Sequence, residues 1–290
     1  MPELPEVQTI ADDLNRKVKN SVITHFWTDW PKVVKHPTIS RFKKEIRGAK
    51  IKRVTRIGKN IILHLDKDRV LLVHQKMTGH LMVGRWDVGG GKVKTLIKGV
   101  FEDRVNQYIH AIFYLKNGQM IALSDMRKFG RIAFGPKEEI FQLPDIKNLG
   151  PDALDPKLNI GILQEKFSKT KRPIKSVLMD PKIIAGIGNI YADEILWSAK
   201  VHPLTPANKI GEQQIRAILK YIKVILNKAL KLRGTSSGDY RDSYGERGKY
   251  GDNILIYQQD RSPCKRCKTP IVKIKVGQRS AHFCPQCQEV

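Results

Sequence analysis

The chain has 290 residues, 41% of them hydrophobic, and 53 Lys and Arg against 28 Asp and Glu give it a net charge of +25. This apolar content excludes a disordered basic tail, and no run approaches the ~20 apolar residues of a membrane-spanning helix. The acidic start MPELPEV is unlike the basic start of a signal peptide. We therefore expect a folded cytoplasmic protein of about two domains. Its partner should be a polyanion, unless the lysines serve solubility alone.

The first half of the chain is predicted to open with a helix over residues 6–19, where Val7, Ile10 and Leu14 recur at helical spacing. Short strands are predicted at 22–28, 51–57, 60–65, 69–74, 111–115, 119–123 and 131–134. Strands at this density are typical of a β-sandwich or barrel. Residues 86–106 contain three consecutive glycines and are predicted to be a loop.

The second half is predicted to be helical. Apolar periodicity indicates short helices at 160–167, 174–180 and 190–200, and a longer one at 215–230. Residues 233–253 are polar, contain five glycines and lack an apolar stripe. They are predicted to form a mobile loop, and a loop of that length is usually functional or disordered.

All four cysteines stand near the C-terminus, as two C-x2-C pairs separated by sixteen residues: Cys264, Cys267, Cys284 and Cys287. This spacing favours a tetrahedral Zn²⁺ site. Four thiolates leave no position for water, so the zinc would be structural. The strand-like runs 271–276 and 280–283 predict a β-hairpin between the pairs. Two disulfides, which a reducing compartment disfavours, or a redox pair are the alternatives.

The N-terminus carries the chemical signal. Removal of Met1 would leave Pro2 with a free secondary amine, which can attack a sugar C1′ and form a cationic iminium. Glu3 and Glu6 could then handle protons beside that amine. The same residues are also ordinary signals for the start of a helix.

Five motifs in chain order resemble the bacterial formamidopyrimidine-DNA glycosylases: PELPEV, Lys59 in RIGKNIILHL, HQKMTG, DMRKFG and AGIGNIYADEIL. The C-terminal YQQDRSPCKRC and GQRSAHFCPQCQ resemble the zinc finger of that family. The resemblance covers the whole chain. It implies an α+β protein of two domains, with an N-terminal β-sandwich flanked by helices and a C-terminal helix-two-turn-helix module plus a β-hairpin zinc finger.

The resemblance also implies a division of the chain and its partners. The expected parts are a catalytic sandwich (1–140), a helix-two-turn-helix domain (150–235), a flexible lesion-capping loop (236–253) and a zinc finger (254–290). We expect one structural Zn²⁺, no other cofactor, double-stranded DNA with oxidised bases or abasic sites as partner, no membrane, and a monomer.

The implied activity is that of a bifunctional DNA glycosylase and AP lyase, which excises formamidopyrimidine and 8-oxoguanine through a proline Schiff base and β,δ-elimination. Pro2 matches the nucleophile, Glu3 the acid–base residue and Glu6 its support. Lys59 and Arg279 match residues that contact phosphate and assist elimination.

The resemblance assigns the DNA contacts as well. Met77, Arg127 and Phe129 match the side chains that fill the gap left by the flipped base, and further contacts are implied for Lys175, Asn189 and Tyr108. The residues alone allow simpler interpretations: core packing for Met77 and Phe129, a solvated charge for Arg127 and Lys59, and a helix cap for Asn189.

The chain departs from the family pattern at several positions. Met126 replaces the usual proline of the DMRKFG motif, and Tyr108 replaces a frequent histidine. Ser237 and Gly238 stand where the family has a larger and a basic residue. These two differences predict weaker binding of 8-oxoguanine, with activity on formamidopyrimidines retained.

Two other functions compete with this one. An endonuclease-eight-like glycosylase would remove oxidised pyrimidines, but its members usually begin PEGPE, whereas Leu4 stands here. A non-catalytic zinc-finger DNA-binding protein would have no need of Pro2, Glu3, Glu6 and Lys59 together.

Overall fold

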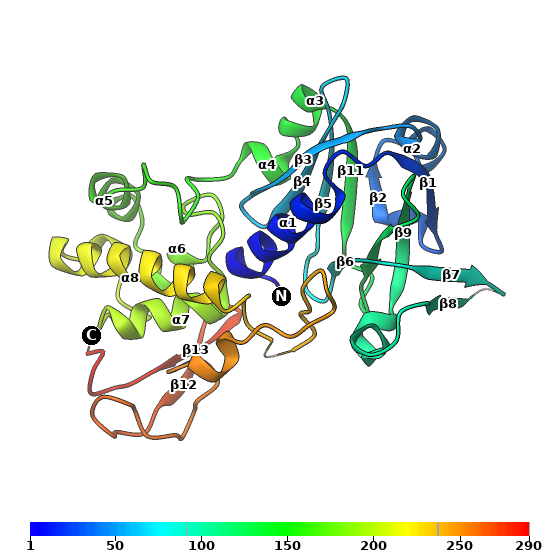
Figure 1. Cartoon of the computed structure of the whole chain (residues 1–290). Coiled ribbons are helices and arrows are strands. Elements are labelled where there is room, and N and C mark those ends of the chain that lie inside the picture. The colour runs from blue at the N-terminus through cyan, green and yellow to red at the C-terminus, as the bar shows by residue number, and fades with distance from the viewer. Residues whose placement is uncertain (91, 237, 290) are drawn as a thin grey trace. The chain divides into compact units, whose positions relative to one another are not determined.

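The computed structural model describes residues 1–90, 92–236 and 238–289. Ser237, which bears on the predicted base preference, lies outside the described residues. The chain divides into two compact units (Figure 1). The first comprises Met1–Lys147 and Leu232–Gly251, and the second comprises Asn148–Lys231 and Asp252–Val290. The predicted boundaries at 140, 150, 235 and 253 stay predictions, but the structure groups 232–251 with the first unit.

The first unit contains two large β-sheets, which confirms the predicted sandwich. One sheet has the order β1-β9-β10-β6, with β1 (Ile23–Thr28), β9 (Ile109–Leu115), β10 (Met120–Ser124) and β6 (His80–Gly84). The other has the order β2-β11-β5-β4-β3, with β2 (Val34–His36), β11 (Arg131–Pro136), β5 (Arg69–His74), β4 (Asn60–Leu65) and β3 (Ile51–Ile57). Apolar side chains from both sheets, such as Phe26, Leu63 and Phe113, form one core.

Helix α1 (Leu4–Val18) packs on β3 and β4 (Figure 1). It buries Val7, Ile10, Leu14 and Val18 in the sandwich core, as the periodicity predicts. The helix α2 (Ile39–Ile46), strand β6 and the short helices α3 (Lys137–Phe141) and α4 (Pro144–Lys147) were not predicted. The strands that were predicted have bounds within three residues of those observed.

The prediction of a loop over 86–106 was wrong. The segment contains the hairpin β7 (Trp86–Gly89) and β8 (Lys92–Thr95), followed by 3-10 turns at Val100–Glu102 and Arg104–Gln107. Trp86 and Phe101 are buried and pack edge to face, with ring centroids 5.6 Å apart. These aromatic side chains pack in a small cluster with Met82, Ile112 and Ala122 of the four-stranded sheet. The sequence did not show this packing, because three consecutive glycines suggested a loop.

The second unit is mainly helical, as predicted. Its helices are α5 (Ile160–Ser168), α6 (Ile174–Leu178), α7 (Asn189–Ser198) and α8 (Glu212–Lys231), with a 3-10 turn at Ala207–Lys209. The predicted hairpin consists of β12 (Val272–Val276) and β13 (Arg279–Phe283), and α7 packs against both α8 and β13 (Figure 1). None of the described helices is both long and apolar enough to cross a bilayer.

The segment 232–251 (orange in Figure 1) returns to the first unit. Its described residues form no strand or α-helix, as predicted, and it leads into a 3-10 turn at Tyr250–Asn253. Its anchoring was not predicted, however: Thr235, Tyr240 and Asp242 are buried. The segment is therefore packed onto the sandwich unit through side chains, although its sequence has no apolar periodicity.

Candidate functional site

The predicted catalytic residues of the N-terminus are gathered at the start of α1. Pro2 is buried, and the exposed fractions of Glu3 and Glu6 are 2% and 1%. The N–H of Glu3 donates to Oε2 of Glu6 (2.8 Å), and the N–H of Thr235 donates to Oε1 (2.7 Å). Backbone donors therefore hold both oxygens of the Glu6 carboxylate, which stabilises a charged acceptor that is out of water.

The segment 232–251 forms part of the surroundings of this carboxylate. Gly234 has a φ of +82°, and a Cβ at this position would lie 2.7 Å from Oε1 of Glu6. Only glycine combines this backbone conformation with so close an approach. The Tyr240 hydroxyl donates to the backbone oxygen of Glu6 (3.4 Å). Burial, and then the nearby Glu6 carboxylate, raise the pKa of Tyr240, so the phenol stays protonated.

Lys59 lies in the two-residue turn that joins β3 to β4, after Gly58 with φ +57°. His74, which the sequence analysis did not single out, pairs with Asn60 across β4 and β5. Burial, followed by the charges of Lys76 and Lys59, lowers the pKa of His74 to about 3. The imidazole is therefore neutral at pH 7, and the positive charges near it are those of the lysines.

Three residues are predicted to fill the gap left by the flipped base, and we call them the wedge residues: Met77, Arg127 and Phe129. They lie on two loops, which we call the wedge loops. The Arg127 guanidinium donates to the sulfur of Met77 (3.3 Å), and its carbon lies 4.6 Å from the ring centroid of Phe129. Phe129 is 47% exposed. Core packing therefore does not explain Phe129, while an exposed apolar group is what a base-stack wedge needs.

A single buried carboxylate organises both wedge loops. Oδ1 of Asp125 accepts hydrogen bonds from the Thr78 hydroxyl (2.5 Å) and the Arg127 N–H (3.3 Å). Oδ2 accepts from the N–H groups of Phe129 (2.8 Å) and Gly130 (2.7 Å). Tyr108 adjoins the same residue, since its carbonyl accepts from the Asp125 N–H (2.8 Å). Asp125 stands first in the DMRKFG motif, of which only Arg127 and Phe129 were among the predicted site residues.

Replacing Thr78 with valine should slow base excision from paired duplex about tenfold. Valine keeps the shape and removes one hydrogen bond to a buried carboxylate, worth about 1.5–3 kcal/mol, and the hydrogen bond that the hydroxyl accepts from the Arg127 N–H (3.2 Å). The loop that carries Met77 is then tied to the loop that carries Arg127 less firmly. Excision should be measured under single-turnover conditions. Thr78→Ser, which keeps the hydroxyl, should restore the rate, and cleavage of abasic DNA should change less because no base must be flipped.

Thr55→Val is the matched control for this substitution. The Thr55 hydroxyl also has one side-chain partner, His64 Nε2 at 2.8 Å, but it lies on β3 away from the wedge loops. An equal loss of rate in the Thr55 and Thr78 variants would contradict a specific role for the Thr78–Asp125 pair.

The second unit carries the remaining predicted DNA contacts. Asn189 is the first residue of α7, and its Oδ1 is buried with no hydrogen-bond partner in the described part of the chain. A helix N-terminus favours a phosphate. Arg279 is the exposed first residue of β13 and lines a pocket of about 230 Å³ together with Arg172, Ser176 and Gln278.

Lys175 is 1% exposed and lies inside the second unit. Its ammonium pairs with Oδ1 of Asp193 (2.6 Å) and donates to the carbonyl of Ser280. Oδ2 of Asp193 accepts from both the N–H and Nδ1 of His282 (3.0 Å each). This network joins α6 and α7 to β13, so Lys175 supports the strand that Arg279 begins. A direct contact between Lys175 and DNA stays a prediction.

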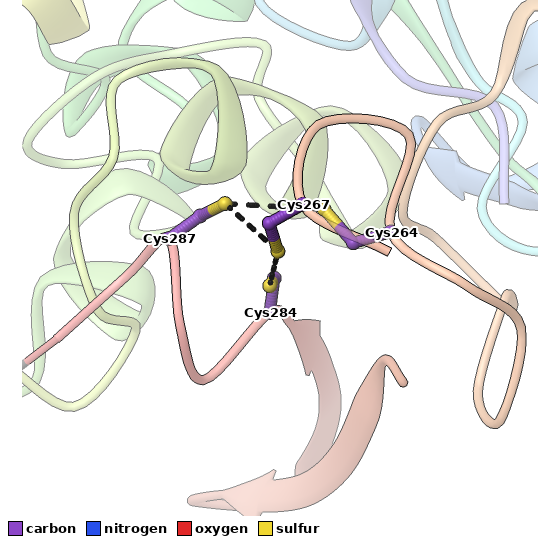
Figure 2. Close-up of side chains that lie close together, drawn as sticks. All are labelled: Cys264, Cys267, Cys284 and Cys287. Carbon is purple, nitrogen blue, oxygen red and sulfur yellow. Dashed lines mark hydrogen bonds between the residues drawn. The ribbon is translucent and has the colours of Figure 1, made fainter. Parts of the chain in front are cut away.

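The four cysteine sulfurs all lie within 4.8 Å of one another (Figure 2). Sγ of Cys267 is 3.3 Å from Cys284 and 3.4 Å from Cys287, and none of the four forms a disulfide. Zn–S bonds of about 2.3 Å separate sulfurs by about 3.8 Å in a tetrahedron. The donor set therefore fits one structural zinc, which the sequence predicted.

Family models match most of the chain in three consecutive parts. The formamidopyrimidine-DNA glycosylase N-terminal domain matches residues 1–132, the formamidopyrimidine-DNA glycosylase H2TH domain matches 149–241, and the zinc finger found in FPG and IleRS matches 261–290. These parts include every predicted site residue.

Individual proteins of this family are similar to the chain over nearly its whole length. The formamidopyrimidine-DNA glycosylase of Oceanobacillus iheyensis is 37% identical over 289 residues, which is 99% of this chain and 98% of that protein. The Enterococcus faecalis enzyme is 33% identical, covering 100% and 98% of the two chains. A solved complex of Lactococcus lactis Fpg with abasic-site DNA has a TM-score of 0.87 at 30% identity, covering 99% and 100%. A complex of the Lactococcus lactis protein with DNA containing Fapy-dG has a TM-score of 0.86 at 30% identity, with the same coverage of 99% and 100%.

The similarity extends from the first residues to the zinc finger, and full-length relatives exceed 30% identity. The endonuclease-eight-like alternative is not favoured by these relatives. The chain belongs to the formamidopyrimidine-DNA glycosylase family.

Proposed function

We propose that this chain excises oxidised purines from duplex DNA and then cleaves the abasic strand, with Pro2 as the nucleophile. Family membership makes it a DNA glycosylase of base-excision repair. The observation that carries the residue roles is the buried Glu3–Glu6 pair, joined by a 2.8 Å hydrogen bond directly beside Pro2. The solved relatives hold abasic-site or Fapy-dG DNA, which supports the same substrates here.

The chemistry begins once Met1 has been removed and Pro2 carries a secondary amine with a pKa near ~8. Its lone pair forms a bond to C1′ while the bond from C1′ to the damaged base breaks, and the base leaves with a proton. The attached amine then loses its proton and the C1′–O4′ bond breaks, with Glu3 giving a proton to O4′, so that the opened sugar carries a cationic iminium. The resulting iminium acidifies the C2′ protons. Loss of one expels the 3′ phosphate by β-elimination, and δ-elimination then expels the 5′ phosphate.

The remaining residues serve binding in this scheme. Met77, Arg127 and Phe129 fill the stack after the base is flipped. Lys59 and Arg279 hold phosphates beside the lesion, and Asn189 offers a helix N-terminus to another. The net charge of +25 makes DNA affinity fall steeply with salt. We place the protein, as a monomer, in the cytoplasm on nucleoid DNA.

Borohydride trapping on a lesion panel tests this proposal. Duplexes with formamidopyrimidine, 8-oxoguanine, an abasic site or an oxidised pyrimidine should be compared. We expect a covalent band with the first three, and faster trapping with formamidopyrimidine because Gly238 offers no side chain to grip 8-oxoguanine. A band that is strongest with the pyrimidine would indicate endonuclease-eight-like specificity. Tight binding without any band would indicate a non-catalytic protein.

A further inference from the structure

Arg233 occupies a backbone conformation that glycine normally takes. Its φ is +61°, and it is followed by Gly234 at +82°. A left-handed conformation costs an ordinary residue roughly 1–2 kcal/mol. Such a cost persists only where the surrounding structure offsets it, often at a functional site. The side chain of Arg233 supplies that offset.

The Arg233 guanidinium bridges two buried carboxylates. It lies 2.5 Å from Oδ2 of Asp13 on α1, and its Nε donates to Oδ2 of Asp242 at 2.7 Å. The two carboxylates are 0% and 1% exposed. Burial by itself would lower the pKa of Arg233, but the hydrogen bonds to Asp13 and Asp242 raise it. The guanidinium is therefore permanently charged between two anions, an arrangement that we call the Arg233 clamp.

The clamp is fixed at both ends. Oδ1 of Asp242 accepts from the N–H of Tyr244 (2.8 Å), and the Ser243 hydroxyl donates to Oδ2 of Asp13 (3.0 Å). Each carboxylate thus has a further hydrogen bond besides the guanidinium. The start and the later part of the segment 232–251 are consequently tied to one point on α1.

Arg233 is two residues before Thr235, which contacts the Glu6 carboxylate. Gly234 follows Arg233 and packs against the Glu6 side chain, and Thr235 gives its N–H to Oε1 of Glu6 at 2.7 Å. The other oxygen of Glu6 receives the N–H of Glu3. A displacement of residue 233 would therefore be transmitted along the chain to the residue that orients Glu3.

We propose that Arg233 is a positioning residue, whose clamp on Asp13 and Asp242 holds the Thr235 N–H on Glu6 and so fixes Glu3 for displacement of the base. This inference rests on the proposed function. It predicts a separation of the two activities. Displacing a base requires proton handling by Glu3, whereas an abasic sugar already presents an aldehyde that the Pro2 amine can attack.

Arg233→Gly is the decisive variant. Glycine adopts φ +61° without strain, so the backbone keeps its conformation while the clamp is lost. We expect kcat for excision of formamidopyrimidine to fall about tenfold or more, as for loss of a hydrogen bond to a charged group. KM for the duplex and the cleavage rate of abasic DNA should stay within about twofold of the starting protein.

Two further proteins separate positioning from stability. Arg16 also pairs with Asp13, and its side chain is 60% exposed. Arg16→Gln removes a partner of Asp13 but leaves the bridge to Asp242, so its kcat should not change. Adding Asp13→Asn and Asp242→Asn to Arg233→Gly removes the unpaired buried charges. This triple variant should recover any loss in melting temperature but not kcat.

Three results would contradict a positioning role for Arg233. Normal kcat in Arg233→Gly, or recovery of kcat in the triple variant, overturns the inference. So does a parallel loss of excision and abasic cleavage that follows the melting temperature, because that indicates a purely structural role. If the unmodified protein, with a confirmed free Pro2, forms no borohydride adduct on any lesion, the proposed function itself fails and the clamp has no reaction to serve.

Discussion

A protein whose Pro2 nitrogen is held in an amide should form no covalent adduct with DNA and should lose excision by roughly 10³-fold or more, the scale on which removal of a nucleophile acts. The amide nitrogen has no available lone pair, so neither attack on C1′ nor the iminium can follow. A short N-terminal extension that ends in a protease site directly before Pro2 produces this state. Borohydride trapping and single-turnover excision measure the effect.

The same preparation provides the control for this experiment. Cleavage of the extension regenerates the Pro2 amine in an otherwise identical protein, and both the adduct and excision should return. DNA affinity should be similar before and after cleavage, since the attraction to DNA comes from 53 Lys and Arg residues that the cleavage leaves unchanged. A strong adduct in the extended protein would assign the nucleophile to another amine.

Removing the zinc should weaken DNA binding strongly. Structural zinc contributes about 10–16 kcal/mol of apparent binding energy to small zinc domains, and without it four closely spaced thiolates have no common partner. The β12–β13 hairpin, and Arg279 with it, should lose its fixed position. We expect Cys267→Ser to lose the metal and to weaken binding to abasic DNA roughly 100-fold at moderate salt, since the finger carries several basic residues that are expected to contact phosphates.

Lys273→Gln is the matched variant for the zinc experiment. Lys273 is an exposed residue of β12, and its replacement removes one charge while leaving the four sulfurs in place. Metal content and fluorescence anisotropy with labelled DNA should be measured on both proteins. Retention of DNA affinity by metal-free Cys267→Ser would show that the hairpin does not need zinc to bind.

The sequence predicted the elements whose signals are local. The helical spacing of Val7, Ile10 and Leu14 located α1, and the spacing of the four cysteines located the zinc site together with its hairpin. It also nominated Met77, Arg127 and Phe129 as the residues that fill the base stack, because the motifs HQKMTG and DMRKFG resemble those of the family. The structure places Arg127 in contact with both Met77 and Phe129, and the roles of the three residues on DNA stay predictions.

The sequence could not show the groups that hold these residues in place. Asp125 contacts Thr78 from 47 positions away, and Arg233 contacts Asp13 from 220 positions away. Such pairs have no periodicity and no fixed spacing, and a charged residue in a polar segment is usually solvated. Trp86 and Phe101 were missed for a related reason, because the small core they share depends on tertiary contact alone.

The return of residues 232–251 to the first unit has a consequence for the time course of synthesis. Glu6 is among the first residues made, but the Thr235 N–H that it accepts stands 229 positions later. At ~5–20 residues per second this interval corresponds to about 10–50 s. The last strand of the two large sheets ends at Pro136, whereas the backbone donor to Glu6 is added about 100 residues later. The growing chain therefore contains every strand of the sandwich before it contains the residues that complete the surroundings of Glu6, and the first unit reaches its full set of contacts only near the end of translation.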